Sequence, residues 1–159
     1  MKIGITGHQR LPQAEDWIWV RDQMDHILST QNQPFEGITC LAAGTDQLFA
    51  ELILKRGGLL YSIVPFEGYE RTFSDIHDQN RYHDFRKVSN EMEVLEWKES
   101  DEESFLIAGK RVVDLSNLLI TVWNGRPAAG LGGTADVVNY AQIKHVNISP
   151  LTFEVHHLR

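Results

Sequence analysis

The chain has 159 residues, of which 42% are hydrophobic and 23% charged, a composition typical of globular domains and not of disordered or fibrous chains. At about 150 residues per domain, this length corresponds to one domain. Fifteen Lys and Arg against 22 Asp and Glu leave a net charge of −7. We therefore expect no general nucleic-acid surface and no affinity for anionic membranes, and we expect any bound phosphate to be held by a few local donors.

Cysteine content and the N-terminal residues bear on the compartment. Cys40 is the only cysteine, so the chain can form neither an internal disulfide nor a cysteine-based zinc cluster. Residues 1–7 place glycine and threonine where a signal peptide needs a long apolar stretch, and no run approaches the roughly 20 apolar residues of a membrane helix. We expect a cytoplasmic chain. The seven histidines include no H-x-x-x-H pair, so we predict no metal site, and we predict no cofactor.

The first half of the chain alternates short apolar runs with segments whose apolar residues recur every 3.6 positions. Pro65 closes the last of these runs, and the Gly57-Gly58 pair ends the helical segment before it. In chain order, the predicted elements are a strand over 2–6, a helix between Pro12 and residue 29, a strand over 37–41, a helix over 47–56 and a strand over 59–64.

The second half is less regular. Residues 66–104 are polar, and the pattern indicates only a helix near 82–95 and a solvated acidic run over 99–103. Regular periodicity then returns, and the predicted elements are a helix over 103–115, a strand over 118–123, a glycine-rich loop over 124–133, a helix over 134–144 and a strand near 146–149.

This alternation of strands with helices predicts the fold class. Strands joined by helical crossovers form βαβ units, and such units give a Rossmann-like three-layer α/β fold with a mostly parallel central sheet. In sheets of this kind, ligands bind at the carboxyl ends of the strands. The turns that follow the predicted strands should therefore meet at one candidate site.

The glycine-rich loop is the strongest phosphate-binding candidate among these turns. Gly130, Gly132, Gly133 and Thr134 lie between an apolar strand and a helix, where backbone N–H groups and the helix N-terminus favour an anion. The loop is neither a Walker A sequence nor a standard dinucleotide G-x-G-x-x-G. The alternative interpretation is a flexible turn in which Thr134 only caps the helix.

Two predicted helices begin with similar sequences, Gly44-Thr45-Asp46 and Gly133-Thr134-Ala135-Asp136. An acidic residue in a first turn interacts favourably with the helix dipole and needs no ligand to explain it. In a functional interpretation, Asp46 or Asp136 would bind ribose hydroxyls or activate water near a sugar. Both interpretations stay open.

Side chains at the other strand exits complete the candidate site. His8 and Arg10 follow the first strand, and aromatic residues after the third strand suit stacking on a base, or else pin a long loop to the core. The predicted ligand-binding residues are Gly7, His8, Arg10, Gly44, Thr45, Phe66, Tyr69, Arg111, Asn124, Gly125, Gly130, Gly132, Gly133 and Thr134, and the catalytic candidates are Asp46 and Asp136.

Several of these segments together resemble the bacterial branch of the SLOG superfamily. The similar segments are 6–10, 42–51, 64–66 with Tyr69, 112–114, 123–128 and 132–138. That superfamily comprises Rossmann-like domains related to the Lonely Guy phosphoribohydrolases and to the DNA-processing protein DprA. The resemblance implies a domain that binds nucleotides or nucleotide-derived signals at the same edge of the sheet.

The resemblance also bears on catalysis. The enzymes of the superfamily use a P-G-G-x-G-T-x-x-E loop with a catalytic glutamate, and its position falls on Val137, one residue after Asp136. One residue in a helix turns a side chain by about 100°, so Asp136 does not simply replace that glutamate. Arg111 lies about one helical turn closer to the next strand than the catalytic arginine of those enzymes.

Three functions follow from the sequence. The first is a binding or sensing domain for a nucleotide-like small molecule, and the second is an N-glycosidic nucleotide hydrolase of the phosphoribohydrolase type, or a transferase. The third is an interaction module that has kept the fold and lost the ligand. The sequence also permits a homodimer or a larger homo-oligomer.

Overall fold

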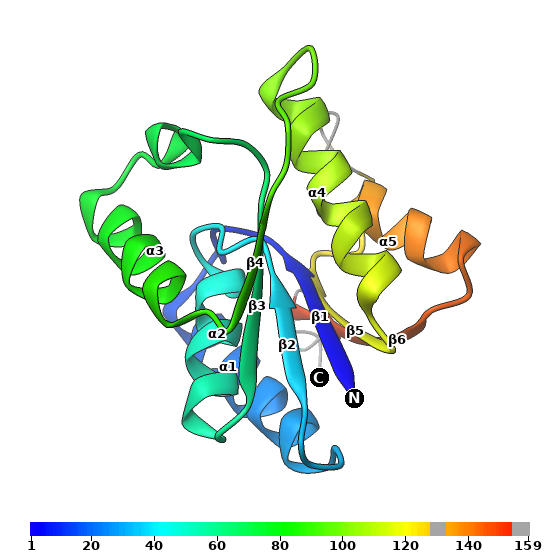
Figure 1. Ribbon diagram of the computed structural model, residues 1–159. Coiled ribbons are helices and arrows are strands. Elements are labelled where there is room, and N and C mark those ends of the chain that lie inside the picture. Colours follow the sequence, from blue (N-terminus) through cyan, green and yellow to red (C-terminus); the bar gives the residue numbers. More distant parts are fainter. Residues whose placement is uncertain (128–132, 154–159) are drawn as a thin grey trace.

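The computed structural model describes residues 1–127 and 133–153. Its centre is a six-stranded sheet in which every pair of neighbours is parallel, in the order β4-β3-β2-β1-β5-β6 (Figure 1). The strands are β1 (Lys2–Gly7), β2 (Glu36–Thr39), β3 (Leu59–Val64), β4 (Glu91–Val94), β5 (Leu118–Trp123) and β6 (Asn147–Thr152). The prediction of a Rossmann-like α/β fold is confirmed.

Helices cover both faces of this sheet (Figure 1). The helices α1 (Ala14–Ser29), α2 (Thr45–Lys55) and α3 (Ile76–Val88) lie on one side, and α4 (Asp101–Leu115) and α5 (Thr134–Ile143) lie on the other. Each side has its own apolar core. One is built around Ile5, Phe49 and Ile120, and the other around Ile38, Val112 and Val137. The result is three layers, with the sheet buried in the middle.

The order of the strands creates a switch point beside β1. From β1 to β4 each new strand is added on the same side, whereas α4 carries the chain back across the sheet so that β5 pairs with the free edge of β1. The segments that follow β1 and β5 therefore diverge to opposite faces of the sheet. Ligand crevices of open α/β sheets form at such a point, at the carboxyl ends of the strands.

The structure corrects one strand boundary near this crevice. We predicted the second strand over 37–41, but β2 ends at Thr39. Leu41 has a φ of 57°, in the left-handed region, which a residue with a bulky side chain rarely adopts. Its side chain is fully buried, so packing holds this conformation. The chain therefore turns out of the sheet at Cys40 and enters α2 at Thr45.

The polar segment 66–104 also differs from the prediction. A helix near 82–95 is wrong, because α3 ends at Val88 and residues 91–94 form the edge strand β4. The strand is short and carries exposed glutamate at the edge, so it lacks the apolar run that reveals the inner strands. Asp75 begins α3 by accepting a hydrogen bond from the backbone N–H of His77 at 2.7 Å, a signal of the kind expected at a helix N-terminus.

Candidate functional site

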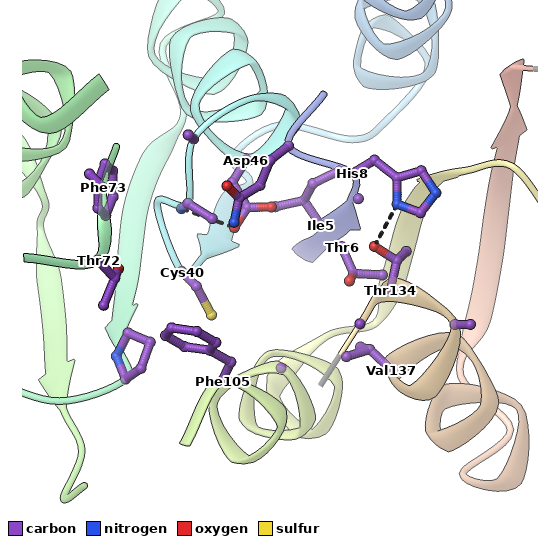
Figure 2. A pocket seen from close by; sticks show the side chains of 18 of the residues that line it. Ile5, Thr6, His8, Cys40, Asp46, Thr72, Phe73, Phe105, Thr134 and Val137 are labelled. Carbon is purple, nitrogen blue, oxygen red and sulfur yellow. Dashed lines mark hydrogen bonds between the residues drawn. The ribbon is translucent and has the colours of Figure 1, made fainter. Parts of the chain in front are cut away.

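A pocket of about 480 Å³ lies at the carboxyl ends of the strands (Figure 2). The exits of β1, β2 and β5, the short helix η1 (Tyr69–Thr72), one face of α4 and the start of α5 all contribute to its wall. Its lining includes Thr6, Gly7, His8, Gln9, Cys40, Asp46, Tyr69, Phe73, Phe105, Asn124, Arg126, Gly133, Thr134 and Val137. The predicted convergence of strand exits is thus what the fold produces.

The start of α5 forms one end of the pocket. Gly133 is the N-cap, and Thr134 and Ala135 are the first two residues of the helix. All three line the pocket. The first N–H groups of an α-helix have no acceptor within the helix, and the partial positive charge of the helix end adds to their effect. This end of the pocket is therefore suited to an anion such as phosphate.

His8 links the segments that form this end of the pocket. Its Nε2 accepts a hydrogen bond from the backbone N–H of Asn124 at 3.3 Å, and its Nδ1 lies 3.2 Å from Oγ1 of Thr134 (Figure 2). Because Nε2 accepts, the proton of the neutral ring is on Nδ1, which then donates to Thr134. The threonine hydroxyl keeps its own proton, which can point to a ligand. His8 thus positions the exits of two strands and a helix.

Asp46 lies at the opposite side of the pocket and is only 6% exposed. Its Oδ2 accepts a hydrogen bond from the backbone N–H of Ala42 at 3.3 Å, and Thr39 and Cys40 also donate to it. Burial outweighs these hydrogen bonds and raises the pKa of this carboxyl from 3.8 to about 7. Near neutral pH, Asp46 can therefore either donate or accept a proton.

Aromatic rings form the remaining wall. Tyr69 is buried, and its ring packs edge to face against Phe73 at 5.1 Å and against Phe105 at 5.9 Å. Burial raises the pKa of the Tyr69 hydroxyl well above its usual range, so it stays a neutral donor. Figure 2 shows the Cys40 sulfur pointing to the Phe105 ring. Burial also raises the pKa of the Cys40 thiol, which is therefore not a reactive thiolate.

Three predicted residues, Gly7, Gly44 and Thr45, support the wall of the pocket by their packing. The Thr45 hydroxyl donates to the backbone oxygen of His8 at 3.0 Å, and Thr45 is fully buried. Gly7 lets this contact form, because a Cβ at Gly7 would lie 2.2 Å from Thr45 Oγ1. Gly44 has a φ of 87° and packs against the backbone of Gln9. Gly7 also lines the pocket, whereas Gly44 and Thr45 fix its shape from outside.

Several predicted residues lie elsewhere in the described part of the chain. Arg111 donates from Nε and Nη2 to Glu93 at 3.0 and 3.1 Å, so its guanidinium is held beside β4. Phe66 is buried behind the pocket and stacks on Phe105 at 5.9 Å. The residues Arg10, Gly44, Thr45, Phe66, Arg111, Gly125 and Asp136 do not contribute to the described pocket lining. Gly130 and Gly132 lie outside the described residues.

Sequence reasoning missed several side chains of the pocket, among them Phe105, Gln9 and Arg126. Phe105 is in the first half of α4, and its role in the wall depends on how that helix crosses the sheet. Gln9 adjoins His8 and carried no signal of its own. Val137 is 3% exposed and lines the pocket. It is the residue on which the resemblance places the catalytic glutamate of the related enzymes.

The described residues contain neither a metal-binding cluster nor a membrane-spanning helix. Over 1–127 and 133–153, no group of three or more His, Cys, Asp or Glu side chains is arranged to hold a metal ion. Among the described helices, none has the length and apolar character needed to span a bilayer.

The sheet order and the pocket at the carboxyl ends of the strands define a Rossmann-like α/β protein. Neither a family model nor a curated protein sequence matches the chain. Solved structures do match. DNA processing protein A from Helicobacter pylori superposes with a TM-score of 0.61 at 16% identity, over 94% of this chain and 64% of that one. The Moco carrier protein from Chlamydomonas gives 0.57 at 15% identity, over 95% of this chain and 75% of that one.

A second DNA processing protein A, from Streptococcus pneumoniae, gives a TM-score of 0.56 at 12% identity, over 98% of this chain and 60% of that one. The chain thus spans less than two thirds of either DNA processing protein. At such identities the likeness is one of fold, and at that level it confirms the resemblance found in the sequence.

One prediction about partners is wrong. We excluded a general nucleic-acid surface because of the net charge of −7, but the Helicobacter protein with the same fold binds single-stranded DNA. Net charge averages over the whole surface, whereas a single strand is held in one groove by a few cationic and aromatic side chains. An acidic chain of this fold is therefore compatible with a nucleic-acid partner.

Proposed function

We propose that the chain binds a nucleotide or a nucleotide-derived ligand in the pocket, as a binding or sensing domain. The observation that carries this proposal is that the two ends of the pocket differ in chemistry. One end presents a helix N-terminus, and the other presents aromatic rings and neutral hydrogen-bonding groups. A nucleotide also has two chemically different ends, with phosphate at one end and an uncharged ring at the other.

At the phosphate end, the proposed donors are the N–H groups of Thr134 and Ala135 and the Thr134 hydroxyl. Arg126 lines the same end and adds positive charge. The Arg126 N–H donates to Oδ1 of Asn124 at 3.0 Å, which fixes the turn after β5. These groups neutralise one phosphate locally, so no broad basic surface is needed.

At the base end, the ligand would face Tyr69, Phe73 and Phe105, with Asp46 nearby. Aromatic faces favour a planar heterocycle, and the Asp46 carboxyl with a pKa of about 7 can pair with either a donor or an acceptor on its edge. The pocket volume of about 480 Å³ is in the usual range for small-molecule sites, which is about 300 to 1,000 Å³.

Binding without turnover is the better supported form of this function, because Val137 lines the pocket where the resemblance implies a glutamate. A valine can neither activate water nor stabilise developing positive charge on a ribose. The test is a melting curve with AMP, NAD, cyclic ADP-ribose and a single-stranded oligonucleotide. A ligand at 100 times its dissociation constant should stabilise the fold by about 2.7 kcal/mol. The absence of any shift across this panel would contradict the proposal.

A second candidate function is N-glycosidic hydrolysis, and Asp46 is the observation that favours it. Its raised pKa would let the carboxylate take a proton from water as the water attacks C1′ of the ribose. The bond from C1′ to the base nitrogen would break, and the base would leave with the electron pair and take up a proton. Release of free base that Asp46→Asn abolishes would establish this function. Intact nucleotides after incubation would leave binding alone.

A further inference from the structure

A second groove adjoins the pocket. Its volume is about 510 Å³, and its lining residues are Phe66, Glu67, Gly68, Arg71, Thr72, Trp97 and Asp101. Thr72 lines both spaces, and Figure 2 places it with Phe73 at the rim of the pocket. The Phe66 ring in the groove stacks on the Phe105 ring in the pocket, at 5.9 Å between centroids and 22° between planes. A ligand can therefore continue from one space to the other past Thr72.

Trp97 gives this groove an aromatic surface. Its side chain is 54% exposed, which is unusual for so large an apolar ring. Its Nε1 donates to Oδ1 of Asp101 at 2.8 Å, and the neighbouring Lys98 N–H donates to Oγ of Ser104 at 2.8 Å. Because both bonds tie the segment to the start of α4, the indole has a fixed orientation. Little side-chain entropy would be lost when a planar ligand stacks on it.

Arg71 gives the groove a cation. Its guanidinium packs over Gly68, within 2.6 Å of where a Cβ on that glycine would lie. In the described part of the chain, Arg71 has no carboxylate within 4.0 Å, although two carboxylates line the groove. Asp101 is bonded to Trp97, and Glu67 lies 3.9 Å from Arg86. The donors of Arg71 are thus available to an anion.

We propose that this groove is a second nucleoside subsite, in which a base stacks on Trp97 while Arg71 pairs with the phosphate that precedes it. This inference rests on the proposed function of the pocket, which would hold the first nucleotide. The ligand class is then two nucleotide units joined through phosphate, either as a free dinucleotide or as part of a single strand. Stacking on an aromatic side chain and pairing with an arginine suit any base and need no specific sequence.

The test compares three probes by calorimetry on the full chain: AMP, the 5′-phosphorylated dinucleotide pApA, and single-stranded oligoadenylate. We expect pApA to bind about 5- to 150-fold more tightly than AMP, which is the gain in affinity typical of one stacked base. If oligoadenylate binds more tightly than pApA, the groove takes a strand. If oligoadenylate binds no better, the groove takes a free dinucleotide.

Two variants test whether the tighter binding of pApA depends on the groove. Trp97→Leu and Arg71→Gln should each remove most of the advantage of pApA and leave the affinity for AMP unchanged within about twofold. Trp97→Phe keeps a stacking surface and should keep most of the advantage. Arg81→Gln is the matched control, because Arg81 is exposed on α3 and contacts Phe85 outside the groove, and it should have no effect.

The outcomes separate this inference from the function on which it rests. If AMP binds and pApA binds no more tightly, the second subsite is wrong and the pocket stands. The same holds if pApA binds more tightly but Trp97→Leu and Arg71→Gln both retain its full advantage. If neither AMP nor pApA binds, the proposed function fails and the subsite fails with it.

Discussion

His8 and Thr134 are 126 positions apart in the chain, yet Nδ1 of His8 and Oγ1 of Thr134 lie 3.2 Å apart at one end of the pocket. The same imidazole accepts the Asn124 N–H through Nε2. One ring therefore connects the exit of β1, the exit of β5 and the first turn of α5. The switch point of the sheet is closed by a hydrogen-bonded side chain, which orients the threonine hydroxyl at the proposed phosphate end.

Thr134→Val should weaken phosphorylated ligands. The substitution keeps the shape of the side chain and removes the hydroxyl, so both the bond to His8 and the proposed donor to phosphate are lost. A lost hydrogen bond to a charged group costs about 1.5–3 kcal/mol, or roughly 10- to 150-fold in affinity. Calorimetric titration with AMP and with adenosine is the measurement.

The comparison of the two ligands decides the location of the phosphate. Adenosine lacks the phosphate, so its affinity should change much less than that of AMP. Thr134→Ser restores the hydroxyl and should bind AMP nearly as well as the unaltered protein. An equal loss for AMP and adenosine in Thr134→Val would show that the phosphate binds elsewhere.

Asp46 should make the stability of the fold depend on pH. Its carboxyl loses a proton near pH 3.8 when unfolded and near pH 7 when folded, so between these values the folded chain holds the extra proton. Stability therefore falls as pH rises from about 4 to about 7, by at most about 4 kcal/mol from this group. Asp46→Asn carries no such proton, so its stability relative to the unaltered protein should increase over that interval.

Urea denaturation at a series of pH values measures this difference directly. Asp25→Asn is a useful control, because Arg56 holds the pKa of Asp25 below its usual range and the control should become relatively less stable as pH rises through the acidic range. Parallel profiles of stability against pH for Asp46→Asn and the unaltered protein would show that the pKa of Asp46 is not raised by folding. The carboxyl would then not donate or accept a proton near neutral pH.

The inner part of the fold was predictable because its signals are local. Both β3 over 59–64 and β5 over 118–123 have the predicted bounds, since each is an apolar run bounded by glycine, proline or polar residues. The edge strand β4 was not predictable in this way. Its residues Glu91 and Met92 are exposed, so burial left no pattern in the sequence.

The candidate site was predictable to the extent that it follows from chain direction. Strand exits meet at one edge of any parallel sheet, so Gly7, His8, Asn124 and Thr134 could be placed together without knowing the strand order. Residues on helices could not, because their position depends on the crossing of α4. Phe105 therefore went unnoticed, and Arg111 was placed at the site although its partner Glu93 belongs to a strand that the sequence did not reveal.

Arg111→Gln should leave the affinity for AMP unchanged. The guanidinium donates twice to Glu93, which also accepts a hydrogen bond from the Tyr61 hydroxyl. The Arg111 side chain is 41% exposed, so we expect the loss of this ion pair to cost less than about 1 kcal/mol of stability. Calorimetry with AMP together with urea denaturation measures both effects. Glu93→Gln is the matched variant, and weaker AMP binding in Arg111→Gln alone would place the guanidinium at the ligand.

Gly7→Ala should destabilise the fold more than alanine at Gly57 does. A Cβ at Gly7 would lie 2.2 Å from Thr45 Oγ1 and 3.0 Å from the backbone oxygen of Val122, so either the exit of β1 or the start of α2 must move. Overpacking of this kind costs about 1–3 kcal/mol or more. Gly57→Ala is the control, since its φ of 76° is strained but nothing lies within 4 Å of the new Cβ.

Thermal melting of Gly7→Ala, Gly57→Ala and the double variant Gly7→Ala with Thr45→Ala checks this explanation. Thr45→Ala removes the closest contact, so the double variant should recover part of the loss that Gly7→Ala alone produces. If the changes in stability from Gly7→Ala and Thr45→Ala simply add, the two side chains do not clash. The need for glycine at the end of β1 would then have a cause other than the close packing of β1 on α2.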